Sequence, residues 1–162
     1  MHLSQLQKFL MNHSLNYFLD SEARSILLSV KPRFVNLITV GSKLVELRRA
    51  VPAQTLRTIA VYSSSPIQAI VALVDIKQVI EGNATQLWGI SRDNGGGITR
   101  KELRDYFKGK KTGFAIMLEN VRVFKKPVNP KEFFEKFTAP QSFRYLTEGE
   151  MLRLVRILEE GK

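Results

Sequence analysis

The sequence contains no cysteine, and this absence excludes several kinds of chemistry at once. Without thiols the chain can form no disulfide, carries no thiolate nucleophile and offers no cysteine-based zinc site. Histidine is scarce as well, because the only two, His2 and His13, stand close to the N-terminus. Their position disfavours a histidine acting as general acid or base. We therefore expect no metal site and no cofactor.

Long apolar runs and nucleotide-binding glycine loops are also missing. No apolar run approaches the roughly 20 residues that a membrane-spanning helix needs. The N-terminus lacks the basic-then-apolar order of a signal peptide, so we expect a cytoplasmic protein without membrane contact. Residues 92–97 read Arg-Asp-Asn-Gly-Gly-Gly and lack the spacing of a dinucleotide or triphosphate loop. This run is predicted to be a flexible surface loop.

Acidic residues are few compared with basic ones. The chain has 25 Lys and Arg against 15 Asp and Glu, which gives a formal net charge of +10 and an isoelectric point near 10.0. Such a field favours polyanions, so nucleic acid is the leading partner, with a merely soluble basic protein as the alternative. A length of 162 residues with 44% hydrophobic content suits one well-packed core.

The stretch over residues 31–49 combines a predicted helix and a predicted strand. Pro32 suits the first helical position, where its missing N–H costs nothing. Apolar residues then follow at i, i+3, i+4 spacing, and Gly41 is placed to end the helix in a left-handed conformation. A helix over residues 32–40 is therefore predicted.

After Gly41 the pattern changes to a period of two. In a strand, Val45 and Leu47 point to one face while Glu46 and Arg48 point to the other. Lys43 has the wrong parity to join these charges from within the strand. It reaches them only if it lies in the turn after Gly41.

The rest of the chain is predicted to alternate strands with short helices. A strand is expected at residues 25–30, 58–62, 67–80 and 113–128, the last with a bulge at Asn120. Helices are expected to begin after the caps Asn83, Thr99 and Thr147. An amphipathic helix is predicted near the N-terminus, where it packs on the core or contacts a partner.

Gly41, Lys43, Glu46 and Arg48 resemble the Gly-x-Lys-x-x-Glu-x-Arg signature of the ASCH family, a branch of the PUA-like β-barrels. Segments 63–66, 106–109 and 140–146 also look like landmarks of this family. The resemblance implies an α+β fold, a mixed β-barrel with peripheral helices. We assign this barrel to residues 25–146, with an N-terminal helical extension over 1–24 and a C-terminal helix over 147–162 packed on the barrel.

The resemblance also implies two classes of function. PUA-like domains bind RNA or modified nucleosides, whereas some ASCH proteins are amidohydrolases of acylated cytidine and others are assigned ribonuclease activity. The amidohydrolase pattern has a nucleophilic threonine three residues after the motif lysine, but Glu46 stands there in this chain. An enzyme would instead use Glu46 as general base and Lys43 to stabilise an oxyanion. Binding of RNA is favoured, with DNA possible and a protein adaptor role as a further alternative.

The predicted site is a basic cleft at the motif. Its candidate ligand-binding residues are Lys31, Lys43, Glu46, Arg48, Ser64, Ser65, Arg144 and Tyr145.

Each group of these residues has a structural alternative. The serines could bind a phosphate or form a plain turn. Arg144 and Tyr145 could stack on a nucleotide or clamp the barrel. Glu46 and Arg48 could contact ligand or pair with each other across the barrel mouth. As cleft charges, Lys43 and Arg48 are expected to contribute little to folding.

Overall fold

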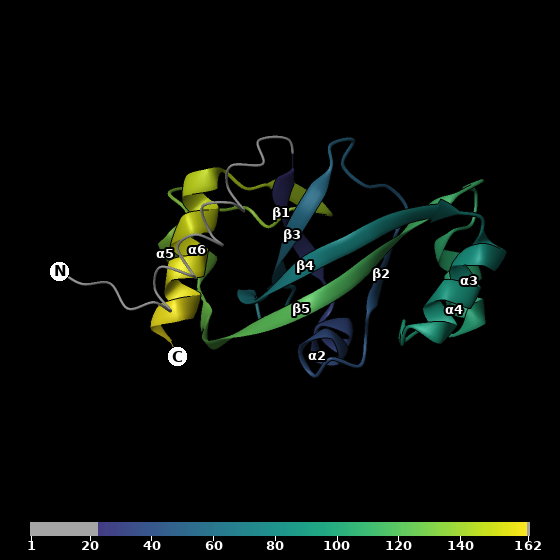
Figure 1. Ribbon diagram of the computed structural model, residues 1–162, viewed down its shortest axis with the longest axis horizontal. Helices are drawn as coiled ribbons and strands as arrows, with labels where there is room; N and C mark the ends of the chain where they lie inside the picture. The colour runs from purple at the N-terminus through teal and green to yellow at the C-terminus, as the bar shows by residue number, and fades with distance from the viewer. Residues whose placement is uncertain (1–22, 162) are drawn as a thin grey trace.

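The computed structural model describes residues 23–161, which form a curved sheet with helices at its ends and beneath it (Figure 1). The strands are β1 (Arg24–Val30), β2 (Val45–Arg48), β3 (Leu56–Ser63), β4 (Ala69–Gly82), β5 (Gly113–Val128) and β6 (Phe143–Tyr145). The helices are α2 (Pro32–Thr39), α3 (Ala84–Asp93), α4 (Arg100–Tyr106), α5 (Pro130–Phe133) and α6 (Glu148–Glu160). The predicted N-terminal helix falls almost wholly on residues 1–22, outside the described residues.

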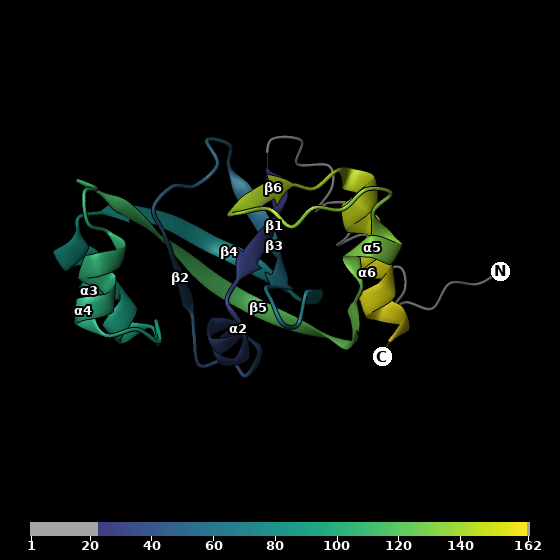
Figure 2. The same cartoon turned by 180° about the vertical axis from the view of Figure 1, so that it is seen from behind.

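The strands of the described chain lie in the order β2-β5-β4-β3-β1-β6. Only the β1–β3 pair is parallel, since the other neighbours run antiparallel. The sheet curls into a half-barrel, and α2 lies beneath its hollow between β1 and β2 (Figure 2). Two parallel strands need a crossover connection, which usually contains a helix. The connection from β1 to β3 runs through α2 and then through β2, at the opposite edge of the sheet.

Alternating side chains divide the apolar residues between the two faces of the sheet. On β3, Ile59 and Val61 face the hollow, where they meet Val35 and Ile38 of α2. Ala60 and Tyr62 face the opposite side and pack with α5 and α6. The buried face of α2 therefore fills the half-barrel.

The remaining helices cover the two ends of the sheet (Figure 1). Met151, Leu154 and Leu158 of α6 pack into the cluster on the outer face. At the other end α3 and α4 bury Leu87 and Leu103 against β2 and β5. None of the described helices is both long and apolar enough to span a bilayer.

Local signals set most of these boundaries as predicted. Asn83, Thr99 and Thr147 each cap the start of a helix as predicted, and each does so in a capping box. Asn120 has a φ of 52°, and the β4–β5 register shifts beside it, which confirms the bulge. Helix α3 is longer than expected, because it continues to Asp93 and takes up the start of the predicted loop.

Candidate functional site

The turn after α2 places Lys43 beside the strand that carries the other motif charges. Gly41 has a φ of 81°, a left-handed conformation that favours glycine, so the chain can reverse there. The backbone N–H groups of Ser42 and Lys43 then both donate to the carbonyl of Leu37, at 3.1 and 3.0 Å. Lys43 thus lies in the turn after Gly41, as predicted, two residues before β2 begins at Val45.

Strand β2 shows the predicted alternation. Val45 and Leu47 pack with α3 and α4, whereas Glu46 and Arg48 lie on the other face. Glu46 pairs in register with Ile116 of β5, whose side chain belongs to the cluster inside the half-barrel. The two charges therefore lie over an apolar interior rather than in open solvent.

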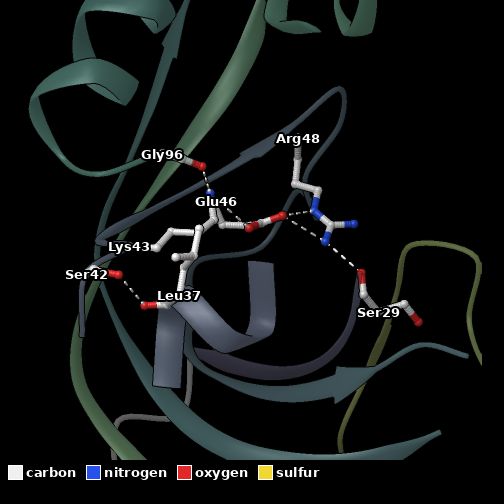
Figure 3. Close-up of polar contacts among 7 residues, drawn as sticks. All are labelled: Ser29, Leu37, Ser42, Lys43, Glu46, Arg48 and Gly96. Carbon is white, nitrogen blue, oxygen red and sulfur yellow. Dashed lines mark hydrogen bonds and ion pairs between the residues drawn. The ribbon is translucent and has the colours of Figure 1, made fainter. Parts of the chain in front are cut away.

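Lys43 is buried, with only 2% of its surface exposed. Its ammonium group donates to the carbonyl of Gly96 at 2.5 Å (Figure 3). It also lies 4.9 Å from the ring centre of Phe34. The nearest carboxylate oxygen, Oε2 of Glu46, is 3.7 Å away, which is an ion pair without a hydrogen bond. Lys43 is therefore enclosed by α2, β2 and the turn that carries Gly96.

The carboxylate of Glu46 is held mainly by Arg48. Its Oε1 accepts from Nε of Arg48 at 3.2 Å and lies 3.0 Å from Nη2. That Nη2 also donates to the backbone carbonyl of Ser29 on β1, at 2.7 Å (Figure 3). The exposed fractions of the two side chains are 7% for Glu46 and 12% for Arg48. Arg48 therefore joins β2 to β1 across the open side of the half-barrel.

Burial lowers the pKa of Lys43 below its ordinary value of 10.5. The Glu46 carboxylate opposes this shift, while the positive charges of Arg48 and Arg33 add to it. The hydrogen bond to Gly96 does not remove the cost of desolvating the ammonium. A lysine with a lowered pKa beside a carboxylate is the kind of group that enzymes use for proton transfer.

Sequence reasoning missed the turn that covers Lys43. Residues 92–97 are predicted to form a flexible surface loop, but residues 92 and 93 belong to α3, Gly96 is buried, and its N–H donates to the Ser91 carbonyl at 2.8 Å. The carbonyl of Asn94 also accepts from the N–H of Leu44 at 2.9 Å. The prediction of a free loop is wrong, because this turn packs directly on the motif. Three consecutive glycines were the only signal of such a close approach.

Lys31 and the turn over residues 64–67, here called the serine turn because it carries Ser64 and Ser65, meet at the end of β1. The N–H of Ser64 donates to the carbonyl of Val30 at 3.0 Å, which places the turn beside Lys31. Lys31 and Ser65 are exposed and Ser64 is half-buried. Arg48 reaches the same end of β1 through the Ser29 carbonyl. The structure thus brings these predicted site residues together at one corner of the molecule.

Arg144 and Tyr145 do not both face this corner. Arg144 pairs with Glu150 of α6 and lies 4.1 Å from the ring centre of Phe134, on the outer face of the sheet. Tyr145 packs with the interior cluster on the opposite face, and Arg24 lies over its ring. Neighbouring residues of β6 point in opposite directions, so the strand cannot present both side chains to one ligand.

The expectation that Lys43 and Arg48 are exposed charges that contribute little to folding is wrong. Lys43 is buried, and the Arg48 side chain is only 12% exposed. A cavity of about 350 Å³ lies elsewhere, lined by residues 51–56 and 76–79, and no predicted site residue lines it. No three described His, Asp or Glu side chains are grouped so that they could hold a metal ion.

The family described as "Domain of unknown function (DUF365)" matches residues 26–139, which include the whole motif and the Gly96 turn. The chain belongs to this family. It is also similar to the ASCH domain-containing ribonuclease of Zymomonas mobilis, with 26% identity over 144 residues that cover 86% of this chain and 95% of the relative.

Solved structures agree with this assignment. The crystal structure of ASCH from Zymomonas mobilis superposes with a TM-score of 0.75 at 26% identity, covering 82% of this chain and 94% of the other. The N-terminal domain of Staphylothermus marinus McrB has a TM-score of 0.51 at 11% identity, covering 86% of this chain and 95% of the other, which is a likeness of fold alone. The predicted ASCH family and PUA-like α+β fold are confirmed.

Proposed function

We propose that this protein binds single-stranded RNA and cleaves it, with Lys43 as the group that accepts a proton from the RNA. The observation that carries the proposal is the buried Lys43 amine, whose pKa is lowered beside Glu46 and under the Gly96 turn. The ribonuclease of Zymomonas mobilis, similar over nearly its whole length, supports RNA as the substrate.

Binding depends on the exposed cations rather than on Lys43. The net charge of +10 attracts a polyanion, and Lys31 stands exposed beside the serine turn at the end of β1. Backbone N–H groups and hydroxyls of such a turn suit phosphate oxygens, and Lys31 adds a charge to the same place. RNA held at this corner lies close to Arg48, because Arg48 bonds the Ser29 carbonyl two residues before Lys31.

The proposed cleavage step depends on the protonation state of the Lys43 amine. A lysine with a lowered pKa is more often neutral near pH 7 than an exposed lysine, and a neutral amine can take a proton. Lys43 would take the 2′-hydroxyl proton while the 2′-oxygen bonds to the adjacent phosphorus. The bond from phosphorus to the 5′-oxygen then breaks, and this oxygen takes up a proton from water. The hydroxide that is left takes the proton from Lys43 and restores the neutral amine. For the amine to reach the RNA, the turn at Gly96 must shift, since it covers Lys43.

The test compares RNA with its 2′-deoxy analogue. We expect the native protein to cut a short single-stranded RNA and to leave unchanged the same strand with one 2′-deoxy position at the cleavage site. Lys43→Met, similar in length and without the amine, should lower the rate by about 10²–10⁴-fold. Lys101→Met is the matched control, because Lys101 is exposed and pairs with Asp105 on its own helix. It should retain the native rate.

Other outcomes would contradict the proposal in different ways. RNA that is bound by the native protein but never cut would indicate a binding module, as the sequence favoured. Cleavage that persists in a folded Lys43→Met protein would remove Lys43 from the chemistry. A chain that neither binds nor cuts RNA would overturn the assignment to RNA altogether.

A further inference from the structure

The two oxygens of the Glu46 carboxylate have unequal surroundings. Oε1 is held by two nitrogens of Arg48, at 3.2 and 3.0 Å. Oε2 is buried and accepts no hydrogen bond from the described residues, although the Lys43 ammonium is only 3.7 Å away. A buried carboxylate oxygen without a donor is costly, so a small rotation that joined Oε2 to Lys43 would be favourable in itself. The arrangement therefore needs something that prevents that rotation.

Arg48 provides this constraint because it is itself fixed. Its Nη2 donates to the Ser29 carbonyl, a backbone group that is part of β1 and cannot turn away. Ser29 is in turn anchored by its hydroxyl, which donates to the Pro140 carbonyl at 2.6 Å, and by its N–H, which donates to the Ser142 carbonyl. The guanidinium is planar and offers its donors in a fixed fork, so it sets the direction of the carboxylate it binds.

We propose that Arg48 is a positioning residue for Lys43: its guanidinium donates both to the Ser29 carbonyl and to Oε1 of Glu46, and in this way it keeps the carboxylate from bonding directly to the ammonium and favours the neutral amine. This inference deepens the proposed function, because a lysine fully paired with a carboxylate would keep its proton and could not serve as a base. Arg48 acts here through Glu46 and touches no reacting atom.

The charges that face Lys43 from the described elements predict the direction in which each substitution shifts the pKa of Lys43. On β2 these are Glu46 and Arg48, and on α2 Arg33, which also pairs with Glu102 of α4. The Gly96 turn contributes only a carbonyl. Removing Arg48 takes away a like charge and frees Glu46 to bond Lys43, and both effects raise the pKa of Lys43. Removing the carboxylate charge of Glu46 lowers that pKa.

The experiment measures the titration of Lys43 by NMR in protein labelled at the lysine Cε atoms, with the Lys43 resonance assigned from Lys43→Met. Arg48→Gln should raise the pKa of Lys43 by about one unit or more, a tenfold change in the ratio of neutral to charged amine. Glu46→Gln should lower it. Arg33→Gln is the matched control, because it removes the same charge without touching Glu46, and it should raise the pKa by much less than Arg48→Gln.

The inference fails if Arg48→Gln leaves the pKa of Lys43 unchanged or lowers it, or if Arg33→Gln raises it equally. If Arg48→Gln does not fold, Arg48→Lys decides the matter. This variant keeps the positive charge but lacks the planar set of donors that fixes the carboxylate. Our proposal therefore predicts a rise in the pKa of Lys43 that is smaller than the rise in Arg48→Gln, whereas an effect of charge alone predicts no rise. The titration contains no RNA, so its result stands apart from the proposed function. In cleavage assays, Arg48→Gln should move the rising limb of the pH–rate profile to higher pH, and failure to cut RNA would concern the proposed function alone.

Discussion

Glu46 and Arg48 show how one ion pair can be structural and still bear on chemistry. Taking both charges out of water is costly, and their attraction offsets this cost only when the geometry is good and the remaining polar atoms are satisfied. Arg48 meets this condition with bonds to Glu46 and to Ser29. The predicted salt bridge at the barrel mouth is thus present, while a ligand contact by either residue stays a prediction.

We predict that Glu46→Ala destabilises the protein strongly. The substitution leaves Arg48 and Lys43 buried without their carboxylate, and stranding a buried charge typically costs about 3–5 kcal/mol. Urea unfolding followed by circular dichroism measures the loss. Lys101→Ala breaks the exposed Lys101–Asp105 pair and should cost about 0.5 kcal/mol or less. Equal losses in the two variants would show that the Glu46 pair carries no special structural role.

Between α3 and α4, three glycines let a turn approach the motif more closely than other residues would allow. A Cβ at Gly95 would lie 1.9 Å from the Ser42 carbonyl oxygen. A Cβ at Gly96 would lie 1.8 Å from Oγ of Ser91, and one at Gly97 would lie 2.6 Å from Leu37. Such distances are far inside van der Waals contact, so the turn has no room for a side chain. The close approach is what brings the Gly96 carbonyl to Lys43.

We predict that Gly96→Ala displaces this turn and lowers the stability of the protein. Forcing extra volume into a packed site costs about 1–3 kcal/mol, and the Lys43 amine would lose its carbonyl partner. Urea unfolding measures the loss. Gly89→Ala is the control on the neighbouring helix α3, where an added Cβ meets nothing within 4 Å. It should be neutral or stabilise by up to about 1 kcal/mol. The same response from both variants would mean that the turn is not held against the motif.

Across the whole molecule, charge is divided between a basic surface and a buried cluster. The net charge of +10 gives a long-range field that favours polyanions. The buried Lys43 is shielded from solvent and adds no phosphate contact of its own in the observed arrangement. Affinity and chemistry should therefore depend on different lysines.

We predict that RNA affinity falls steeply with salt, because each neutralised phosphate releases counterions. Fluorescence anisotropy of a short labelled RNA at several salt concentrations measures the slope of log affinity against log salt. Lys31→Ala should reduce this slope by about one unit. Lys43→Met should leave it unchanged, since that lysine is buried. A slope that Lys43→Met reduces as much as Lys31→Ala would place Lys43 among the phosphate contacts.

The sequence by itself determined the elements, because the signals that set them are local. The Gly41 turn, the three capping boxes, the Asn120 bulge and the alternation of β2 each depend on residues a few positions apart. The same local pattern placed Lys43, Glu46 and Arg48 beside one another. The four motif residues, together with segments 63–66, 106–109 and 140–146, were enough to predict the ASCH family.

Tertiary structure alone decided the environment of those residues. Lys43 and Gly96 are 53 positions apart, and nothing near either one indicates that they meet. Arg48 finds its carbonyl on β1 only because the sheet curls until its second-last strand faces β2. The burial of Lys43, which lowers its pKa, results from contacts with residues that are distant in the sequence. Turns and helix caps, in contrast, depend on hydrogen bonds between residues that are close in the sequence. A local pattern therefore predicted which charges stand together, and the fold decided that they are enclosed.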